Sequence, residues 1–346
     1  MRPKVSILIP AKNEEKVIGR LLASIQKVDY PKEKLEVFVI VDGSTDRTAD
    51  IARSFKGVKV LEQKEPRKCK GEALNAALPL TKGEIIAVFD ADGIVSPNAI
   101  KAAVAHFKKK EILAVTGPHI SQKSKNLISK GCEIEMSMHN LAQKIANKMG
   151  FDAHINGGNF YVRKEVLEKI GGFEIETLVE DSALAFALKA KKQKNPKIIL
   201  EQKAIVYQQN PHTISAFIGQ RSRWSRGLIK LIKKYSSVSA PSIWLSSILE
   251  GVHFYAAPFS VALTFGLFML PLLSKAELII LTPIATIILA YIVFAMISLA
   301  RERKIKDAVY IPIWLGLSAL EFFIFCKAII DEALNKEFTW FKTPRF

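Results

Sequence analysis

The stretch EIIAVFDADG, residues 84–93, joins an apolar run to two acidic side chains. The run has the composition of a buried strand, and Asp90 and Asp92 follow at its end. Two carboxylates so close together repel each other unless a cation lies near them. Hard divalent ions such as Mg²⁺ or Mn²⁺ prefer oxygen ligands and often bridge protein carboxylates to phosphates. A metal and phosphate site is therefore one interpretation of this stretch, and a solvated acidic turn is the other.

Residues 1–120 alternate between short strand-like runs and amphipathic helical stretches. The other predicted strands are VSILIP, VFVIV and VKVLEQ, and helices are predicted over 14–28 and 49–55. Such βαβ alternation predicts a mainly parallel sheet covered by helices, with ligands at the carboxyl ends of the strands. Asp42 lies at one such end, within VDGSTD, where an Asx turn is the alternative interpretation. No GxGxxG follows the first strand and no GxxxxGK[ST] occurs, which argues against dinucleotide oxidoreductases and P-loop NTPases.

A second acidic pair lies downstream, in LVED. The segment NGGNFYVRKEVLEKIGGF, residues 156–173, predicts a glycine-rich turn, a short strand and a helix. Glu180 and Asp181 then precede the apolar helical stretch SALAFALKAKK. An acidic pair at the start of a helix is most often a cap that suits the helix dipole. A transferase also needs a carboxylate that takes a proton from the acceptor hydroxyl, and this pair is the best candidate.

The second half of the chain carries long apolar runs. Residues 252–273 contain no charged side chain, and 276–300 contain only one, near the start. Both are long enough to span a bilayer. Residues 308–330 contain Glu321 and Lys327, so this run is predicted either to span the membrane or to lie at its interface as a re-entrant segment.

Charge predicts which side of the membrane the chain occupies. The start MRPKVSILIP is too short an apolar run for a signal peptide, and RERKIKD after the second run carries four cations against two anions. We expect a multi-pass protein of the cell membrane whose N-terminal domain is cytoplasmic. The formal net charge of +17 comes without a nucleic-acid-binding motif, so anionic membrane lipids are the expected partner and nucleic acid is not. The three cysteines are too far apart for a metal or redox pair.

Six motifs together carry a resemblance to a known family. In chain order they are PAKNEEKVIGRLL, VDGSTDRTADIA, CKGEALNAAL, DADG, GGFEIETLVED and QRSRW. The sequence resembles family 2 glycosyltransferases, and within them the membrane branch with cellulose, chitin and hyaluronan synthases. The resemblance implies an α/β GT-A fold, a nucleotide-sugar donor, Mg²⁺ or Mn²⁺, and transfer with inversion.

The resemblance also implies roles for individual residues. Asp181 matches the catalytic base and Asp92 the metal ligand, while Glu180 is placed at the acceptor site. The donor nucleotide is assigned to Asp42, Lys70, Asp90 and Arg223.

The QRSRW motif has a physical interpretation of its own. Arg223 can stabilise the charge of the leaving diphosphate, whereas the flat indole of Trp224 can stack on the acceptor sugar beside Gln220. The motif lies in FIGQRSRWSRGLIKLIKKY, residues 217–235, whose pattern predicts an interfacial helix. An ordinary basic amphipathic helix is the alternative.

The C-terminal stretch TWFKTPRF, residues 339–346, resembles the gating loop of this branch. The resemblance makes Thr343 and Arg345 nucleotide contacts and Trp340 part of a lid. This role requires a cytoplasmic tail, which favours two crossings plus a re-entrant third segment. A basic tail near the membrane is the alternative.

The predicted organisation has four parts. A cytoplasmic GT-A domain covers 1–215, interfacial helices 216–250, the membrane region 251–336 and the gating-like tail 337–346. The predicted function is sugar transfer from a UDP-sugar, or a GDP-sugar, to a glycan or membrane-associated acceptor, with processive polysaccharide synthesis included. One alternative is transfer of a single sugar to polyprenyl phosphate or a glycolipid. A non-catalytic membrane protein that binds nucleotide sugars is another.

Overall fold

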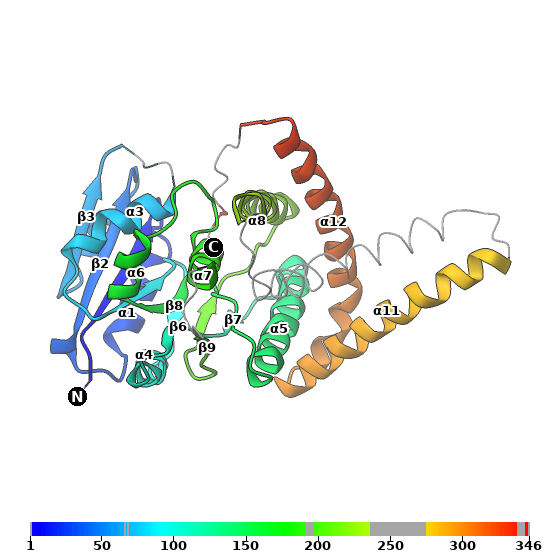
Figure 1. The fold of residues 1–346 in the computed structure, drawn as a ribbon, viewed down its shortest axis with the longest axis horizontal. Coiled ribbons are helices and arrows are strands. Elements are labelled where there is room, and N and C mark those ends of the chain that lie inside the picture. Colours follow the sequence, from blue (N-terminus) through cyan, green and yellow to red (C-terminus); the bar gives the residue numbers. More distant parts are fainter. Residues whose placement is uncertain are drawn as a thin grey trace.

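The computed structural model of the chain describes residues 2–65, 67, 69–190, 197–235, 275–337 and 343–344. A seven-stranded sheet in the order β3-β2-β1-β4-β8-β6-β9 forms its N-terminal half (Figure 1). Its strands are β1 (Val5–Ala11), β2 (Leu35–Asp42), β3 (Val58–Gln63), β4 (Ile85–Phe89), β6 (Ile112–Thr116), β8 (Asn159–Arg163) and β9 (Lys197–Leu200). A small second sheet, β5-β10-β7, contains β5 (Ile94–Val95), β7 (His119–Ser121) and β10 (Val206–Gln208).

Parallel pairing dominates the large sheet. β1 is parallel to β2 and β4, β2 is parallel to β3, and β6 is parallel to β9. Only β8 runs antiparallel to its neighbours β4 and β6 among the described strands of this sheet. Parallel neighbours need crossover connections, and helices between the first four strands provide them. The prediction of a mainly parallel α/β sheet is confirmed.

Helices cover both faces of the large sheet. Side chains alternate along each strand, so Ile7 and Ile9 pack on one face while Leu8 packs on the other. The first face is covered by α1 (Ile18–Gln26), α2 (Thr48–Arg53) and α4 (Ala99–Ala105). The second is covered by α3 (Lys70–Ala77), α6 (Lys164–Ile170) and α7 (Glu180–Ala190). Because both faces are buried, the central strands are mostly apolar, as in VSILIP, in which Ser6 is the one polar residue.

The first predicted helix is shorter than expected. It was predicted over 14–28, but α1 begins at Ile18. Asn13 has a left-handed backbone with φ of 54°, and the backbone N–H of Glu14 donates to the Thr48 hydroxyl at 2.7 Å. These two features hold residues 13–17 in a loop tied to α2.

Four long helices lie beside the two sheets. They are α5 (Leu127–Lys148), α8 (Ile214–Tyr235), α11 (Lys275–Arg301) and α12 (Ile311–Ala333). α5 and α8 lie between the sheet and α12 in Figure 1, and α12 packs against both of them. Ile134 and Met138 of α5 share one apolar cluster with Trp314 of α12, and Phe217 of α8 shares another with Leu317.

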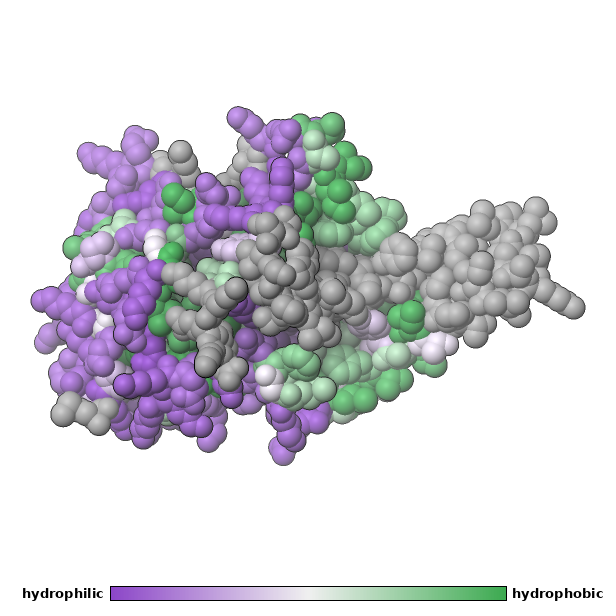
Figure 2. Space-filling view, in the orientation of Figure 1, coloured by the Kyte–Doolittle hydropathy of each residue, from purple (hydrophilic) through white to green (hydrophobic). Residues whose placement is uncertain are grey.

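The apolar surface of the protein lies on the C-terminal helices. Figure 2 shows hydrophobic residues over α11 and α12, whereas the sheet domain is mostly hydrophilic. Within the described residues one stretch, Ile305–Ala333, is long and apolar enough to cross a membrane. The run predicted over 276–300 falls in α11, and the run over 252–273 lies outside the described residues. A multi-pass topology therefore stays a prediction.

The helix predicted to lie at the interface is present as α8, but part of its charge faces inward. The side chains of Arg221 and Arg226 are buried rather than exposed to lipid or solvent. Arg226 pairs with Glu332 of α12 at 2.5 Å. These cations join helices together and do not form part of a membrane-facing surface.

Candidate active site

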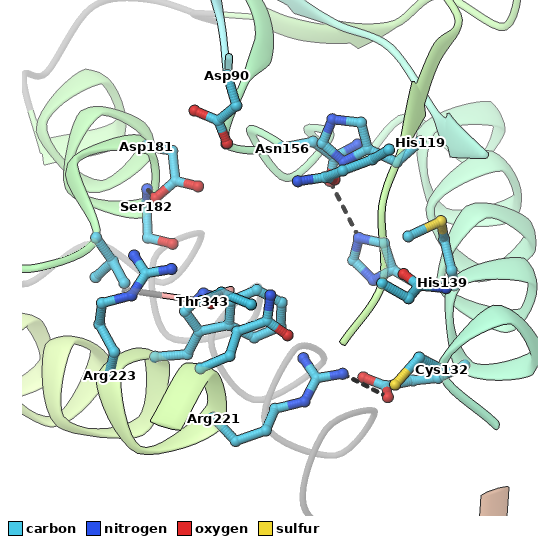
Figure 3. A pocket seen from close by; sticks show the side chains of 18 of the residues that line it. Asp90, His119, Cys132, His139, Asn156, Asp181, Ser182, Arg221, Arg223 and Thr343 are labelled. Atoms are coloured by element: carbon cyan, nitrogen blue, oxygen red, sulfur yellow. Dashed lines mark hydrogen bonds and ion pairs between the residues drawn. The ribbon is translucent and has the colours of Figure 1, made fainter. Parts of the chain in front are cut away.

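A cavity lies where the carboxyl end of β4 and the strands β7 and β10 approach α5, α7 and α8 (Figure 3). Several predicted site residues far apart in the sequence line it: Lys70, Asp90, Glu180, Asp181, Gln220, Arg223, Trp224 and Thr343. Asp42 and Asp92 do not line it, and Arg345 and Trp340 lie outside the described residues. Most of the predicted motifs therefore meet around one space, while their individual roles stay predictions.

A glycine turn holds two of the carboxylates in place. Asn156 begins this turn, and its side-chain amide donates to the carbonyl of Gly117 at 2.8 Å. A β-carbon at Gly157 would lie 2.3 Å from Oδ2 of Asp181, and one at Gly158 would lie 2.5 Å from Cγ of Asp90. Gly158 also has a φ of +75°. Only residues without side chains allow both carboxylates to approach the same turn so closely.

Lys70 links the two acidic motifs. Its ammonium lies 2.7 Å from Oδ1 of Asp90 and 2.6 Å from Oε1 of Glu180. Burial alone would lower the pKa of Lys70, but the charges of Asp90 and Glu180 outweigh burial and raise that pKa. Lys70 is therefore cationic. Glu180 is buried and directed at Lys70, which leaves Asp181 as the more accessible carboxylate of the pair.

Asp42 occupies a separate position at the end of β2. Its carboxylate accepts hydrogen bonds from the backbone N–H of Arg67 at 3.1 Å and from the Arg67 guanidinium at 2.9 Å. The structure thus places this predicted nucleotide contact at the same carboxyl edge of the sheet as Asp90, but outside the cavity that contains Asp181.

The residues Asp90 and Asp92 fit a divalent cation in their chemistry. A turn follows β4, with the N–H of Gly93 donating to the carbonyl of Asp90 at 3.0 Å, and Asp92 is buried beneath it. The described residues contain no group of three or more His, Cys, Asp or Glu side chains that could hold a metal. Two hard carboxylates would therefore need further oxygen ligands, such as those of a phosphate group or of water, to complete the coordination of such an ion.

The QRSRW motif lies on α8 beside the cavity. Gln220, Arg223 and Trp224 line it, and Nη1 of Arg223 donates to the carbonyl of Leu178 at 3.4 Å. The motif contains a residue to which the sequence analysis gave no role. The guanidinium carbon of Arg221 lies 4.2 Å from the centre of the Trp224 ring, a cation–π contact that orients the indole.

His119 is a second residue that the sequence analysis missed. It begins β7, lines the cavity and faces it in Figure 3. Burial lowers the pKa of His119 to about 4, although the charges of Asp90 and Asp181 oppose this change. A neutral imidazole therefore lies near both carboxylates. No local pattern marks this residue, because its position depends on the second sheet.

One face of α5 forms the far wall of the cavity. The residues Cys132, Glu135, Met136, His139 and Asn140 line the cavity at a helical spacing of three or four. His139 lies 3.2 Å from Oδ1 of Asn156, which connects this face to the glycine turn. The sequence shows that Glu135 and His139 lie four residues apart and so share one face of a helix. It does not show whether that face meets a cavity or solvent.

Comparison with known proteins identifies the family of the sheet domain. Residues 6–171 match the model of Glycosyl transferase family 2. These residues belong to glycosyltransferase family 2. The predicted family is therefore confirmed for these residues, and the narrower prediction of the membrane branch with cellulose, chitin and hyaluronan synthases stays a prediction.

Two relatives show how far the similarity extends. The chain is 35% identical over 231 residues to a β-monoglucosyldiacylglycerol synthase of Nostoc sp., covering 65% of this chain and 49% of that protein. It thus spans about half the length of that relative. It is 28% identical over 372 residues to the probable glycosyltransferase YdaM of Bacillus subtilis, covering 99% of this chain and 87% of YdaM.

A solved structure has a similar fold. The mannosyltransferase PcManGT from Pyrobaculum calidifontis, in complex with GDP-Man and Mn²⁺, matches with a TM-score of 0.64 and 23% identity. The match covers 97% of this chain and 89% of that chain. The expected GT-A-like α/β fold with C-terminal helices is confirmed.

Proposed function

We propose that the protein transfers one sugar from a nucleotide-diphosphate sugar to a membrane lipid, with inversion at the anomeric carbon. One observation carries the proposal: Gly157 and Gly158 hold Asp181 and Asp90 around a single turn, in a cavity that α8 and α12 also line. A carboxylate for proton transfer and a carboxylate for the donor are thereby placed side by side, next to the most apolar part of the molecule.

Asp181 is the proposed general base. It takes the proton of an acceptor hydroxyl while the oxygen attacks the anomeric carbon and the bond from that carbon to the diphosphate breaks. Arg223 faces the charge that develops on the leaving diphosphate. Gln220 and Trp224 orient the acceptor, and Thr343, with Arg345 beyond the described residues, contributes to the donor side.

Glu180 takes a different proposed role from the one that the sequence suggested. It was assigned to the acceptor, but its carboxylate lies 2.6 Å from Lys70 and is only 5% exposed. We assign it to holding Lys70 against Asp90 on the donor side. Asp42 is the proposed contact to the nucleotide base. Asp90 and Asp92 would hold Mg²⁺ or Mn²⁺, which supplies positive charge beside the diphosphate when it is bound.

A lipid acceptor is better supported than polymer synthesis. The relative with 35% identity is named a β-monoglucosyldiacylglycerol synthase, which favours the alternative that the sequence analysis gave over its main prediction. The apolar stretch Ile305–Ala333 packs beside the cavity through α8 and could hold the enzyme at a bilayer. We propose that the catalytic domain lies on the cytoplasmic face.

Product analysis tests the proposal. The full chain in membranes is given labelled UDP-glucose, UDP-N-acetylglucosamine or GDP-mannose with Mn²⁺ and total membrane lipid. One discrete lipid-sugar species and equimolar release of nucleotide are expected. A ladder of products would instead establish glycan extension. Donor binding without release or transfer, across a broad donor panel, would favour a non-catalytic nucleotide-sugar-binding protein.

A further inference from the structure

Three charged side chains meet at the end of the cavity that lies away from Asp90. Arg221 of α8 lies between Glu135 of α5 and Glu321 of α12, with Nη2 of Arg221 2.6 Å from Oε2 of Glu135 and Nε 3.4 Å from Oε1 of Glu321. All three residues line the cavity. Their side chains are 5% exposed for Arg221, 17% for Glu135 and 7% for Glu321. We call this group the Arg221 cluster.

The Arg221 cluster has no excess positive charge. One guanidinium is shared by two carboxylates, so the cluster is neutral if one carboxyl group is protonated and negative if neither is. Rings also cover the guanidinium, since its carbon lies 4.2 Å from the Trp224 ring centre and 5.0 Å from that of Phe217. The cation of the QRSRW motif nearest to α12 is thus already neutralised by the protein itself.

Uncharged hydrogen-bonding groups also line the cavity that contains the Arg221 cluster. They include Asn140, Asn156, Gln209 and Asn210. Such amides donate to and accept from hydroxyl groups but add no charge. A phosphate monoester or diester placed against the Arg221 cluster would meet a guanidinium that Glu135 and Glu321 already share. Among the described residues, the other cations that line the cavity, Lys70 and Arg223, are assigned to the donor side.

The donor end of the cavity differs in one respect. Lys70 is also shared between two carboxylates, Asp90 and Glu180. There, however, Asp90 and Asp92 would hold a divalent cation that neutralises the donor diphosphate. An acceptor phosphate would bring no such ion to the Arg221 cluster.

We infer that the Arg221 cluster makes this end of the cavity a subsite for a neutral, hydroxyl-bearing lipid headgroup and that Glu135 excludes lipid acceptors carrying phosphate. The inference rests on the proposed function and narrows it. A diacylglycerol or a neutral glycolipid fits this chemistry, and polyprenyl phosphate does not.

Matched acceptors test the subsite in the full-length protein. Diacylglycerol is compared with phosphatidylglycerol of the same acyl chains, and polyprenol with polyprenyl phosphate. In each pair only the second member carries a phosphate group, and in phosphatidylglycerol that phosphate also bears a glycerol. Transfer is measured with one labelled donor in vesicles of fixed composition. In at least one pair, kcat/KM should be roughly tenfold to hundredfold higher for the neutral member than for the phosphate-bearing member. This is the effect expected of one unfavourable charge in a partly buried site. Equal or better use of the phosphate-bearing members would overturn the inference.

Glu135→Gln tests the residue itself. It removes one negative charge from the Arg221 cluster while keeping a hydrogen-bond acceptor, so the ratio of kcat/KM between neutral and phosphate-bearing acceptors should fall about tenfold. Glu135→Asp keeps the charge and should retain the wild-type preference for neutral acceptors. Glu111→Gln is the matched control, because Glu111 is exposed at the opposite end of β6, and its ratio should equal that of wild type.

The outcomes separate the inference from the proposed function. Equal losses on both acceptor classes in Glu135→Gln would mean that Glu135 is only structural. Donor-nucleotide binding checks that each variant is folded. If Glu135→Gln does not bind the nucleotide, the inference is decided by how the wild-type protein uses the neutral and phosphate-bearing acceptors. Transfer to no lipid at all would contradict the proposed function, whereas transfer to phosphate lipids alone would contradict only the inference.

Discussion

The two halves of the cavity are built in different ways. The donor half lies at strand ends, where Asp90 follows β4 directly and the glycine turn precedes β8. The acceptor half lies between helices, where Glu135, Arg221 and Glu321 come from three helices separated by long stretches of chain. The donor half is specified by short sequence motifs that each lie next to a buried strand. The acceptor half exists only once α5, α8 and α12 have packed together.

This difference predicts different sensitivities. Changes at the strand ends and at the start of α7 should affect catalysis or donor binding more than folding, because these side chains lie outside the apolar core of the sheet. Changes among the helices should alter acceptor choice or stability, because their charged groups are buried and depend on one another.

The largest effect is expected at Asp181. Asp181→Asn should lower transfer roughly 10²- to 10⁴-fold, the usual range for loss of a general base, while donor affinity and folding remain unchanged. Asparagine caps helices about as well as aspartate, so a purely structural role would leave activity almost intact. Asp50→Asn is the control, since the Asp50 side chain is 71% exposed. Near-normal transfer by Asp181→Asn would mean that another group is the base.

The glycine turn should be nearly as sensitive. Alanine at Gly158 would press against Asp90 and displace it, and a shift of about 1 Å in a reacting group can cost roughly 10²-fold in rate. Gly171→Ala is a matched control, because Gly171 also has a left-handed backbone, with φ of +91°, but no atom lies within 4 Å of the added carbon. The left-handed backbone should cost both variants about 1–2 kcal/mol of folding free energy, and the contact with Asp90 should add to this cost in Gly158→Ala alone. Only Gly158→Ala should lose transfer. Equal rates in the two variants would show that the contact with Asp90 is unimportant.

A smaller effect is expected at Asp92. Asp92→Asn removes a charge beside the proposed cation, so the affinity for UDP or GDP with Mn²⁺ should fall about tenfold, the loss of one charge-assisted interaction. Affinity measured with EDTA instead of Mn²⁺ should be the same in wild type and variant. An unchanged dependence on Mn²⁺ would make Asp92 a turn residue and not a metal ligand.

The smallest effect concerns His119 and pH. Its pKa is about 4 in the folded protein against an ordinary 6.5, so below pH 6.5 the unfolded chain binds a proton that the folded protein does not. This group therefore contributes a loss of stability as pH falls from 6.5 toward 4, at most about 1.4 kcal/mol per pH unit. His119→Gln should show a shallower fall in Tm over this range and a parallel curve above pH 7. Identical slopes below pH 6.5 would contradict the burial effect.

The sequence by itself determined the sheet and the family. In runs such as VSILIP and IIAVF most side chains on both faces are apolar, and this local property predicts helices above and below. Acidic motifs at the ends of such strands predict a ligand site because parallel strands end at one edge. Asp90 was therefore a candidate from its place after a strand, Asp181 was a candidate from the acidic pair that begins a helix, and Lys70 was indicated only by the resemblance to family 2 glycosyltransferases.

The tertiary structure alone decided what those candidates touch. Glu180 and Asp181 are neighbours in the sequence, but only packing shows that Glu180 pairs with Lys70 while Asp181 lies against Gly157. The antiparallel direction of β8, the burial of Arg221 and the position of His119 likewise depend on contacts between distant segments. A sequence pattern shows that a helix has a polar face. Whether that face meets solvent, lipid or a cavity is fixed by the free energy of packing the other helices around it, which no local pattern contains.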